Sequence, residues 1–236
     1  MSRPIVVFDL DGTLVDTAPD LVDTLNVILT REGIPPVAYD TARTLIGGGV
    51  RPMLERALAE QNRVLPAQEM DDLFETFLKH YADHIADHSR PFPGVEQALD
   101  ILAQRGCVLA VCTNKLEWLS LRLLDALRLT QRFAAVCGQD TFDVKKPHPD
   151  MLRKTVAAAG GDMTQTVMVG DSATDIRLAQ AAKVPVVAVD FGYTDTPVVV
   201  FKPDLVISRY DALPTAVFEL LPAESDKLGS GSAGGR

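Results

Sequence analysis

Two acidic residues, Asp9 and Asp11, stand one residue apart directly after a short apolar run, residues 5–8. This β-branched run is typical of a strand buried on both faces of a parallel sheet. Two carboxylates this close repel each other, so one resists ionisation unless a cation lies nearby, and such oxygen ligands suit Mg²⁺. The alternative is a strand end with two solvated acids, so the prediction of a metal site depends on partners elsewhere in the chain.

A second polar segment, Thr113-Asn114-Lys115, follows the predicted strand 108–112. It offers a hydroxyl, an amide and backbone N–H groups where a helix begins, and a helix N-terminus attracts anions. Thr and Asn are also common as plain helix caps, so this segment alone leaves both interpretations open.

Lys146 lies in a third segment, residues 145–149, where two prolines stiffen the chain just before a helix. A lysine held there is suited to neutralise a phosphoryl group and the charge that develops on it during transfer. The alternative is an ordinary solvated surface lysine.

The fourth segment, residues 169–175, again places an acid, Asp171, after an apolar strand. Asp175 follows four positions later and shares a helix face with Asp171 if the helix has begun. One acid can complete a metal site with Asp9 while the other positions it or the lysine. The alternative is an ordinary acidic first turn of a helix.

Two regions of the chain differ in the spacing of their apolar residues. Residues 17–90 show helical apolar spacing, whereas helices and strands alternate after that point, which predicts a parallel sheet covered on both faces. We expect an α/β fold with a Rossmann-like parallel core, residues 1–16 and 91–224, and an inserted all-α cap, residues 17–90. Residues 225–236 are rich in Gly and Ser, and we expect a flexible tail there.

The chain has 236 residues, 47% of them hydrophobic and 23% charged, and a formal net charge of −9. These values are typical of a soluble globular protein, and the lack of a long basic run argues against nucleic-acid or anionic-membrane partners. Neither a secretory signal nor an apolar run of about 18 residues is visible. The odd set of cysteines, Cys107, Cys112 and Cys137, fits reduced, buried thiols, so we expect a cytoplasmic enzyme.

Together and in this order, the four segments resemble the motifs of the haloacid dehalogenase-like hydrolases. The matching residues are Asp9-Leu10-Asp11-Gly12-Thr13, Thr113, Lys146, and Gly170-Asp171-Ser172 with Asp175. The resemblance extends from about residue 5 to the last predicted strand and includes a helical cap inserted after the first motif. Within that superfamily the chain looks most like phosphoglycolate phosphatases, through residues 8–21, 146–149 and 192–194.

The resemblance implies a Mg²⁺-dependent phosphate monoester hydrolase whose nucleophile, Asp9, becomes an aspartyl-phosphate. Asp11 then acts as general acid and later as general base. In the resembling family, Mg²⁺ is held by the carboxylates of Asp9 and Asp171 and by the backbone carbonyl of Asp11. Thr113, Asn114 and Lys146 would bind the phosphoryl group, and Asp175 would orient Lys146 or a metal-bound water. The implied partner is a small phosphorylated metabolite, above all 2-phosphoglycolate.

A carboxylate-bearing substrate needs a cation, which we expect the cap to supply. Arg51 follows the run Gly47-Gly48-Gly49 and is the first candidate, with Arg43 as a weaker one. The alternative for Arg51 is an exposed arginine at a helix start. His80, His84 and His88 recur every fourth position, but the interleaved acids favour the solvated side of the last cap helix over a metal site.

Other functions stay open at this point. A β-phosphoglucomutase-like enzyme or a broad sugar-phosphate phosphatase shares much of the finer resemblance. A non-catalytic phosphate-binding or regulatory protein on the same scaffold is an alternative of another class, although the intact acids and Lys146 argue against it. The sequence is compatible with a monomer or a homodimer.

Overall fold

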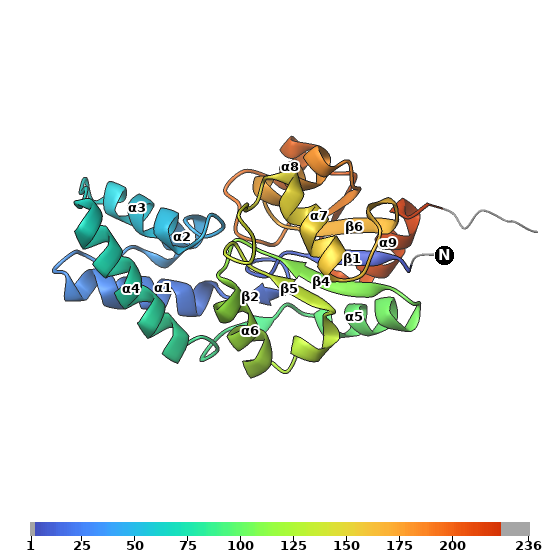
Figure 1. The fold of residues 1–236 in the computed structure, drawn as a ribbon. Coiled ribbons are helices and arrows are strands. Elements are labelled where there is room, and N and C mark those ends of the chain that lie inside the picture. Colours follow the sequence, from blue (N-terminus) through green and yellow to red (C-terminus); the bar gives the residue numbers. More distant parts are fainter. Residues whose placement is uncertain (1–2, 223–236) are drawn as a thin grey trace, which may run out of the picture.

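The computed structural model describes residues 3–222, and its central feature is a six-stranded parallel sheet with strand order β5-β4-β1-β6-β7-β8 (Figure 1). The strands are β1 (Ile5–Phe8), β4 (Val108–Cys112), β5 (Ala135–Cys137), β6 (Thr166–Gly170), β7 (Val186–Val189) and β8 (Leu205–Ile207). β1 lies between β4 and β6 in the middle of the sheet, and all four of its residues are fully buried. The continuous apolar run at the start of the chain therefore forms a central strand, which is buried on both faces of the sheet.

Helices cover both faces of this sheet. They are α5 (Val95–Gln104), α6 (Glu117–Ala126), α7 (Pro149–Ala158), α8 (Ala173–Ala182) and α9 (Leu213–Leu220), joined by short 3₁₀ helices at Thr130–Arg132, Met163–Gln165, Val198–Phe201 and Tyr210–Ala212. Val6 and Phe8 share one core cluster with α5, α6 and α9, whereas Ile5 and Val7 share the other with α7 and α8. Alternate residues of β1 thus anchor opposite layers, and the predicted α/β fold is confirmed.

Four helices stand between β1 and the rest of the sheet in sequence: α1 (Ala18–Arg31), α2 (Tyr39–Thr44), α3 (Val50–Glu60) and α4 (Ala67–Asp83). They form a separate layer at one end of the molecule, on the left in Figure 1. α1 and α4 pack against each other and bury Leu25 and Ile28 on one side and Phe77 and Tyr81 on the other. We propose that this layer is the inserted cap.

The chain enters and leaves the cap through two short antiparallel strands, β2 (Val15–Asp16) and β3 (Arg90–Pro91). These strands could not be predicted from the sequence, because two residues are too few to show an alternating pattern. The spacing of His80, His84 and His88 predicts a last cap helix that reaches about residue 88, but α4 ends at Asp83. The buried Asp20 explains this difference, because its carboxylate accepts the backbone N–H groups of His88 and Ser89 at 2.8–3.2 Å and so replaces helical hydrogen bonds.

Within residues 3–222, no helix combines the length and apolar character needed to cross a bilayer. The cysteines at positions 107, 112 and 137 are buried free thiols. The tail expected at residues 225–236 lies outside the described residues.

The carboxylate of Asp20 ties the start of the cap to its end, so its removal should destabilise the protein. Asp20 is 3% exposed and also accepts the Ser89 hydroxyl at 2.6 Å. Asp20→Ala would leave these buried donors unpaired, and we expect the unfolding free energy to fall by about 2–3 kcal/mol in a denaturant titration. Asp23→Ala, on the exposed side of the same helix, is the matched control. An equal loss in both variants would show that the Asp20 contacts contribute nothing specific.

Candidate active site

The C-terminal ends of β1 and β6 bring three acids together. Carboxylate oxygens of Asp9, Asp171 and Asp175 all lie within 4.8 Å of one another, and all three residues are buried. The ammonium of Lys146 lies between two of them, 2.8 Å from Asp9 Oδ1 and 2.7 Å from Asp175 Oδ1. Residues separated by more than 130 positions therefore meet at one point, because parallel strands end at the same edge of the sheet.

Local structure fixes the orientation of each acid. Asp171 Oδ1 accepts the Thr13 hydroxyl at 3.0 Å, and Asp171 Oδ2 accepts the backbone N–H of Tyr193 at 2.8 Å. Asp175 sits in a capping box at the start of α8, where its Oδ2 accepts the backbone N–H and the hydroxyl of Ser172 at 3.2 and 2.6 Å. The proposed supporting acid is thus held by a feature that also starts the helix.

Two glycines let the backbone approach Asp171 closely. A Cβ atom at Gly192 would lie 2.2 Å from Asp171 Oδ2, and one at Gly12 would lie 2.5 Å from the same oxygen. Gly12 also has a φ of +82°, in the left-handed region that favours glycine. Any side chain at these positions would therefore displace the Asp171 carboxylate.

Burial of so many charges shifts the pKa values in this cluster. Burial raises the pKa of Asp171 to about 8, and the carboxylates of Asp175 and Asp9 add to the rise. Burial also raises the pKa of Asp9 to about 6, although the ammonium of Lys146 opposes part of this shift. Burial alone would lower the pKa of Lys146, but Asp175 and Asp9 outweigh it and the net shift is upward. Lys146 therefore stays charged. Its single positive charge does not balance the three carboxyl groups of the cluster, which leaves an excess of acid.

This excess of acid fits a bound cation. Among the described residues, Asp9, Asp171 and Asp175 are the one group of side chains placed to share a metal ion. A divalent cation would hold buried carboxylates in their ionised form, which burial otherwise disfavours. Carboxylate oxygens are the ligands that hard cations such as Mg²⁺ prefer, so the donor set fits the ion expected from the sequence.

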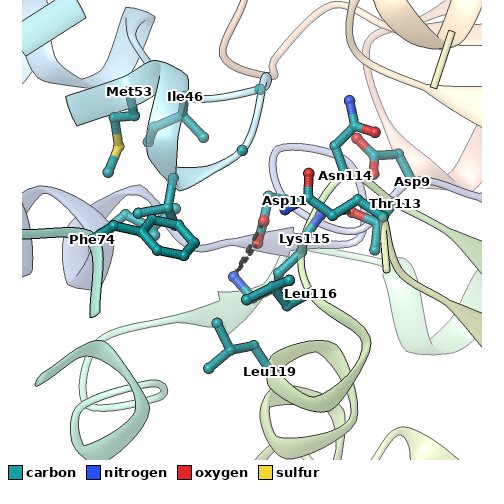
Figure 2. A pocket seen from close by; sticks show the side chains of 15 residues that line it. Asp9, Asp11, Ile46, Met53, Phe74, Thr113, Asn114, Lys115, Leu116 and Leu119 are labelled. Atoms are coloured by element: carbon teal, nitrogen blue, oxygen red, sulfur yellow. Dashed lines mark hydrogen bonds and ion pairs between the residues drawn. The ribbon is translucent and has the colours of Figure 1, made fainter. Parts of the chain in front are cut away.

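Asp11 lies outside this cluster and faces a cavity between the core and the cap (Figure 2). Lys115 Nζ contacts both of its carboxylate oxygens, at 3.1 and 3.2 Å, and donates to the hydroxyl of Tyr81 on α4 at 2.9 Å. Lys115 is not among the site residues predicted from the four motifs. Its position directly after Thr113 and Asn114, at the end of β4, is the signal that could have identified it.

The cavity itself measures about 40 Å³, which is room for only a few water molecules. Its polar end is formed by core residues after β1 and β4, and its walls are largely apolar side chains, several of them from the cap (Figure 2). The lining residues are Asp9, Asp11, Leu21, Ile46, Gly47, Gly49, Val50, Met53, Phe74, Thr113, Asn114, Lys115, Leu116, Leu119 and Gln139. The site is thus shaped for a small ligand with a polar end.

Two other predicted phosphate-binding residues, Thr113 and Asn114, lie in the lining of this cavity and are buried. The side-chain amide of Asn114 donates to the backbone carbonyl of Lys146 at 3.4 Å. The Thr113 hydroxyl accepts the backbone N–H of Lys115 at 3.2 Å. Both side chains therefore stand next to the carboxylate cluster.

The two candidate arginines of the cap, Arg51 and Arg43, do not line the cavity. Arg51 pairs with Asp71 and lies over the ring of Phe74, and its side chain is 40% exposed. Arg43 donates to the backbone carbonyls of Phe191 and Gly192 at 3.0 Å, so it joins the cap to a core loop. This placement does not support Arg51 as a ligand for the substrate carboxylate.

The cap histidines lie away from the carboxylate cluster. The ring of His80 stacks on that of His84 at 4.6 Å, and His80 Nδ1 lies 3.3 Å from the Thr24 hydroxyl. His84 Nδ1 lies 2.8 Å from Asp87 Oδ2 at the surface. These are the contacts of a partly exposed helix side, as the interleaved acids indicate.

Comparison with known proteins decides the family. A family model described as haloacid dehalogenase-like hydrolase matches residues 6–189. The chain belongs to the haloacid dehalogenase-like hydrolases. The resemblance predicted from the four motifs is confirmed, and the matched range runs from β1 through α8 to β7.

Relatives within this family cover nearly the whole chain. A protein of Mesorhizobium japonicum named phosphoglycolate phosphatase is 53% identical over 221 residues, or 94% of this chain and 97% of that protein. One of the same name from Neisseria meningitidis is 35% identical and covers 94% of this chain and 95% of its own length. The crystal structure of a predicted phosphoglycolate phosphatase from Haemophilus somnus superimposes with a TM-score of 0.85 at 28% identity, covering 92% of this chain and 98% of that one.

The raised pKa values predict that the metal-free protein loses stability as pH rises. The unfolded acids are already ionised at pH 5, whereas folded Asp9 and Asp171 still bind protons up to about pH 6 and 8. Raising the pH from 5 to 8 in EDTA should therefore lower the unfolding free energy by several kcal/mol, on the order of 5 kcal/mol, most of it from Asp171. Added Mg²⁺ should reverse this loss at pH 8, because it binds the ionised carboxylates.

Matched variants separate this effect from other titrating groups. Asp171→Asn removes the acid with the higher pKa and should flatten both the pH slope and the Mg²⁺ response in denaturant titrations. Asp125→Asn removes an exposed acid on α6 and should leave both unchanged. The same slope in the parent and in Asp171→Asn would contradict the assignment.

Proposed function

We propose that this chain is a Mg²⁺-dependent phosphatase that hydrolyses 2-phosphoglycolate through an aspartyl-phosphate on Asp9. The carboxylate cluster carries the proposal: Asp9 lies beside the ammonium of Lys146 and within 4.8 Å of Asp171 and Asp175, and it borders the cavity. Relatives named phosphoglycolate phosphatase support the choice of substrate.

In the first half of the reaction, an Asp9 carboxylate oxygen forms a bond to phosphorus and the bond from phosphorus to the glycolate oxygen breaks. A carboxylate is already an anion, so this nucleophile needs no general base. Asp11, which faces the cavity, donates a proton to the departing glycolate oxygen. In the second half, Asp11 takes a proton from water, whose oxygen attacks phosphorus and releases inorganic phosphate and free Asp9.

The remaining residues hold the anion and balance its charge. Lys146 faces the carboxylate that attacks, so its ammonium offsets the charge of the incoming phosphoryl group. Thr113 and Asn114 supply hydrogen-bond donors from the adjoining loop. The carboxylates of Asp9 and Asp171 and the backbone carbonyl of Asp11 would hold Mg²⁺. When bound, Mg²⁺ supplies a positive charge that stabilises the phosphoryl oxygens.

Relatives named phosphoglycolate phosphatase favour a short phosphorylated acid over the substrates of a β-phosphoglucomutase-like enzyme or a broad sugar-phosphate phosphatase. The volume of the cavity does not by itself separate these substrates. The buried free thiols fit the cytoplasmic location expected from the sequence.

Replacement of the proposed nucleophile gives the direct test. Asp9→Asn keeps the shape of the side chain but removes the anionic oxygen, so it should lower kcat for phosphoglycolate by at least about 10⁴-fold. Release of inorganic phosphate in the presence of Mg²⁺ measures the effect, and circular dichroism checks that the fold is retained.

Controls make the result specific. Asp125→Asn, the same change at an exposed position on α6, should keep parental activity. EDTA should abolish the activity of the parent, and glucose 1-phosphate should be a poor substrate. A fully active Asp9→Asn variant would exclude the aspartyl-phosphate, and an inactive parent would exclude the proposed function.

A further inference from the structure

Lys115 joins the two parts of the proposed active site. It follows β4 in the core and is 7% exposed, yet its ammonium donates to Tyr81 on α4 of the cap at 2.9 Å. The same ammonium lies 3.1 and 3.2 Å from the two carboxylate oxygens of Asp11 (Figure 2). A buried charge with these partners is positioned with little freedom, as a recognition group must be.

Within residues 3–222, no other cationic side chain lines the cavity. Apolar side chains such as Phe74, Met53 and Leu119 form much of its wall (Figure 2). A carboxylate that enters such surroundings loses its hydration and needs a cation within contact distance. Arg51, the cap cation expected from the sequence, pairs with Asp71 instead.

The chemistry of the proposed substrate places two demands on the site. In phosphoglycolate a single methylene carbon separates the ester oxygen from the carboxylate. The group that protonates the ester oxygen and the group that binds the carboxylate must therefore be neighbours. Asp11 and Lys115 are in direct contact, so this pair meets both demands.

We propose that Lys115 is the residue that binds the carboxylate of the substrate and makes the enzyme selective for phosphorylated short-chain acids. This inference rests on the proposed function and adds the group that selects the substrate. In the structure the ammonium is paired with Asp11 and Tyr81. On binding, the substrate carboxylate becomes its partner and Asp11 turns to the ester oxygen.

A pair of substrates that differ only at the carboxylate tests this assignment. In 2-hydroxyethyl phosphate, CH₂OH replaces the carboxylate of phosphoglycolate. Lys115→Met should lower kcat/KM for phosphoglycolate by about 10- to 100-fold, chiefly through a higher KM, because one charge-assisted contact is lost. For 2-hydroxyethyl phosphate we expect a change of less than about threefold, since no carboxylate is bound.

Two further variants keep the comparison interpretable. Lys79→Met removes an exposed lysine from α4 and should leave both substrates unaffected. Lys115→Gln keeps a hydrogen-bond donor for Asp11 and Tyr81 but has no charge. It should lose the same selectivity, and it replaces the Met variant if that variant fails to fold.

The outcomes separate this inference from the proposed function. An equal loss for both substrates in Lys115→Met would show that Lys115 serves the phosphoryl group or Asp11, and the inference would be wrong while the phosphatase assignment stands. Loss of selectivity in Arg51→Met with retention in Lys115→Met would likewise overturn it. A parent enzyme that releases phosphate from neither compound would overturn the proposed function and the inference with it.

Discussion

The ammonium of Lys146 between buried carboxylates is the interaction on which the rest of the site depends. Three acids at the end of a parallel sheet repel one another, and Lys146 reaches two of them at 2.7 and 2.8 Å. Much of the surrounding structure serves this cluster: the α8 capping box holds one acid, and glycines at positions 12 and 192 let the backbone reach another. The arrangement is costly for folding without a cation but well suited to bind one.

The same cluster is connected to the hinge of the proposed cap. The backbone N–H of Tyr193 donates to Asp171. The hydroxyl of the same tyrosine accepts the backbone N–H groups of Thr17 and Ala18 and donates to Asp16. One residue therefore contacts both an acid of the cluster and the segment where the chain enters the cap. Arg43 adds a contact from the cap to the same core loop. The position of the cap is thus linked to the geometry of the acids.

The convergence of Asp9 and Asp171 could be expected from the sequence because it depends on few local rules. Apolar runs before Asp9 and Asp171 indicate buried parallel strands, and parallel strands end at one edge, so their following residues meet. The contacts that charged side chains make with residues distant in sequence could not be predicted in this way. The partner of Arg51, Asp71, lies on another helix, and helical spacing does not say which way an arginine at a helix start will turn. The contacts of Lys115 with Asp11 and Tyr81 could not be predicted for the same reason, since they depend on how cap and core pack.

These contacts also show how charge and shape are divided between the two layers. Every charged side chain that lines the cavity belongs to the core, in the segments after β1 and β4, whereas the described cap residues in the lining are apolar or glycine. Ionised groups need fixed partners, which a rigid sheet edge provides better than a layer joined by two hinges. Apolar walls can change volume by a shift of helices without leaving a charge unpaired. In this arrangement the cap contributes apolar walls, and the charge that would recognise an anion stays with the core residues proposed to perform the chemistry.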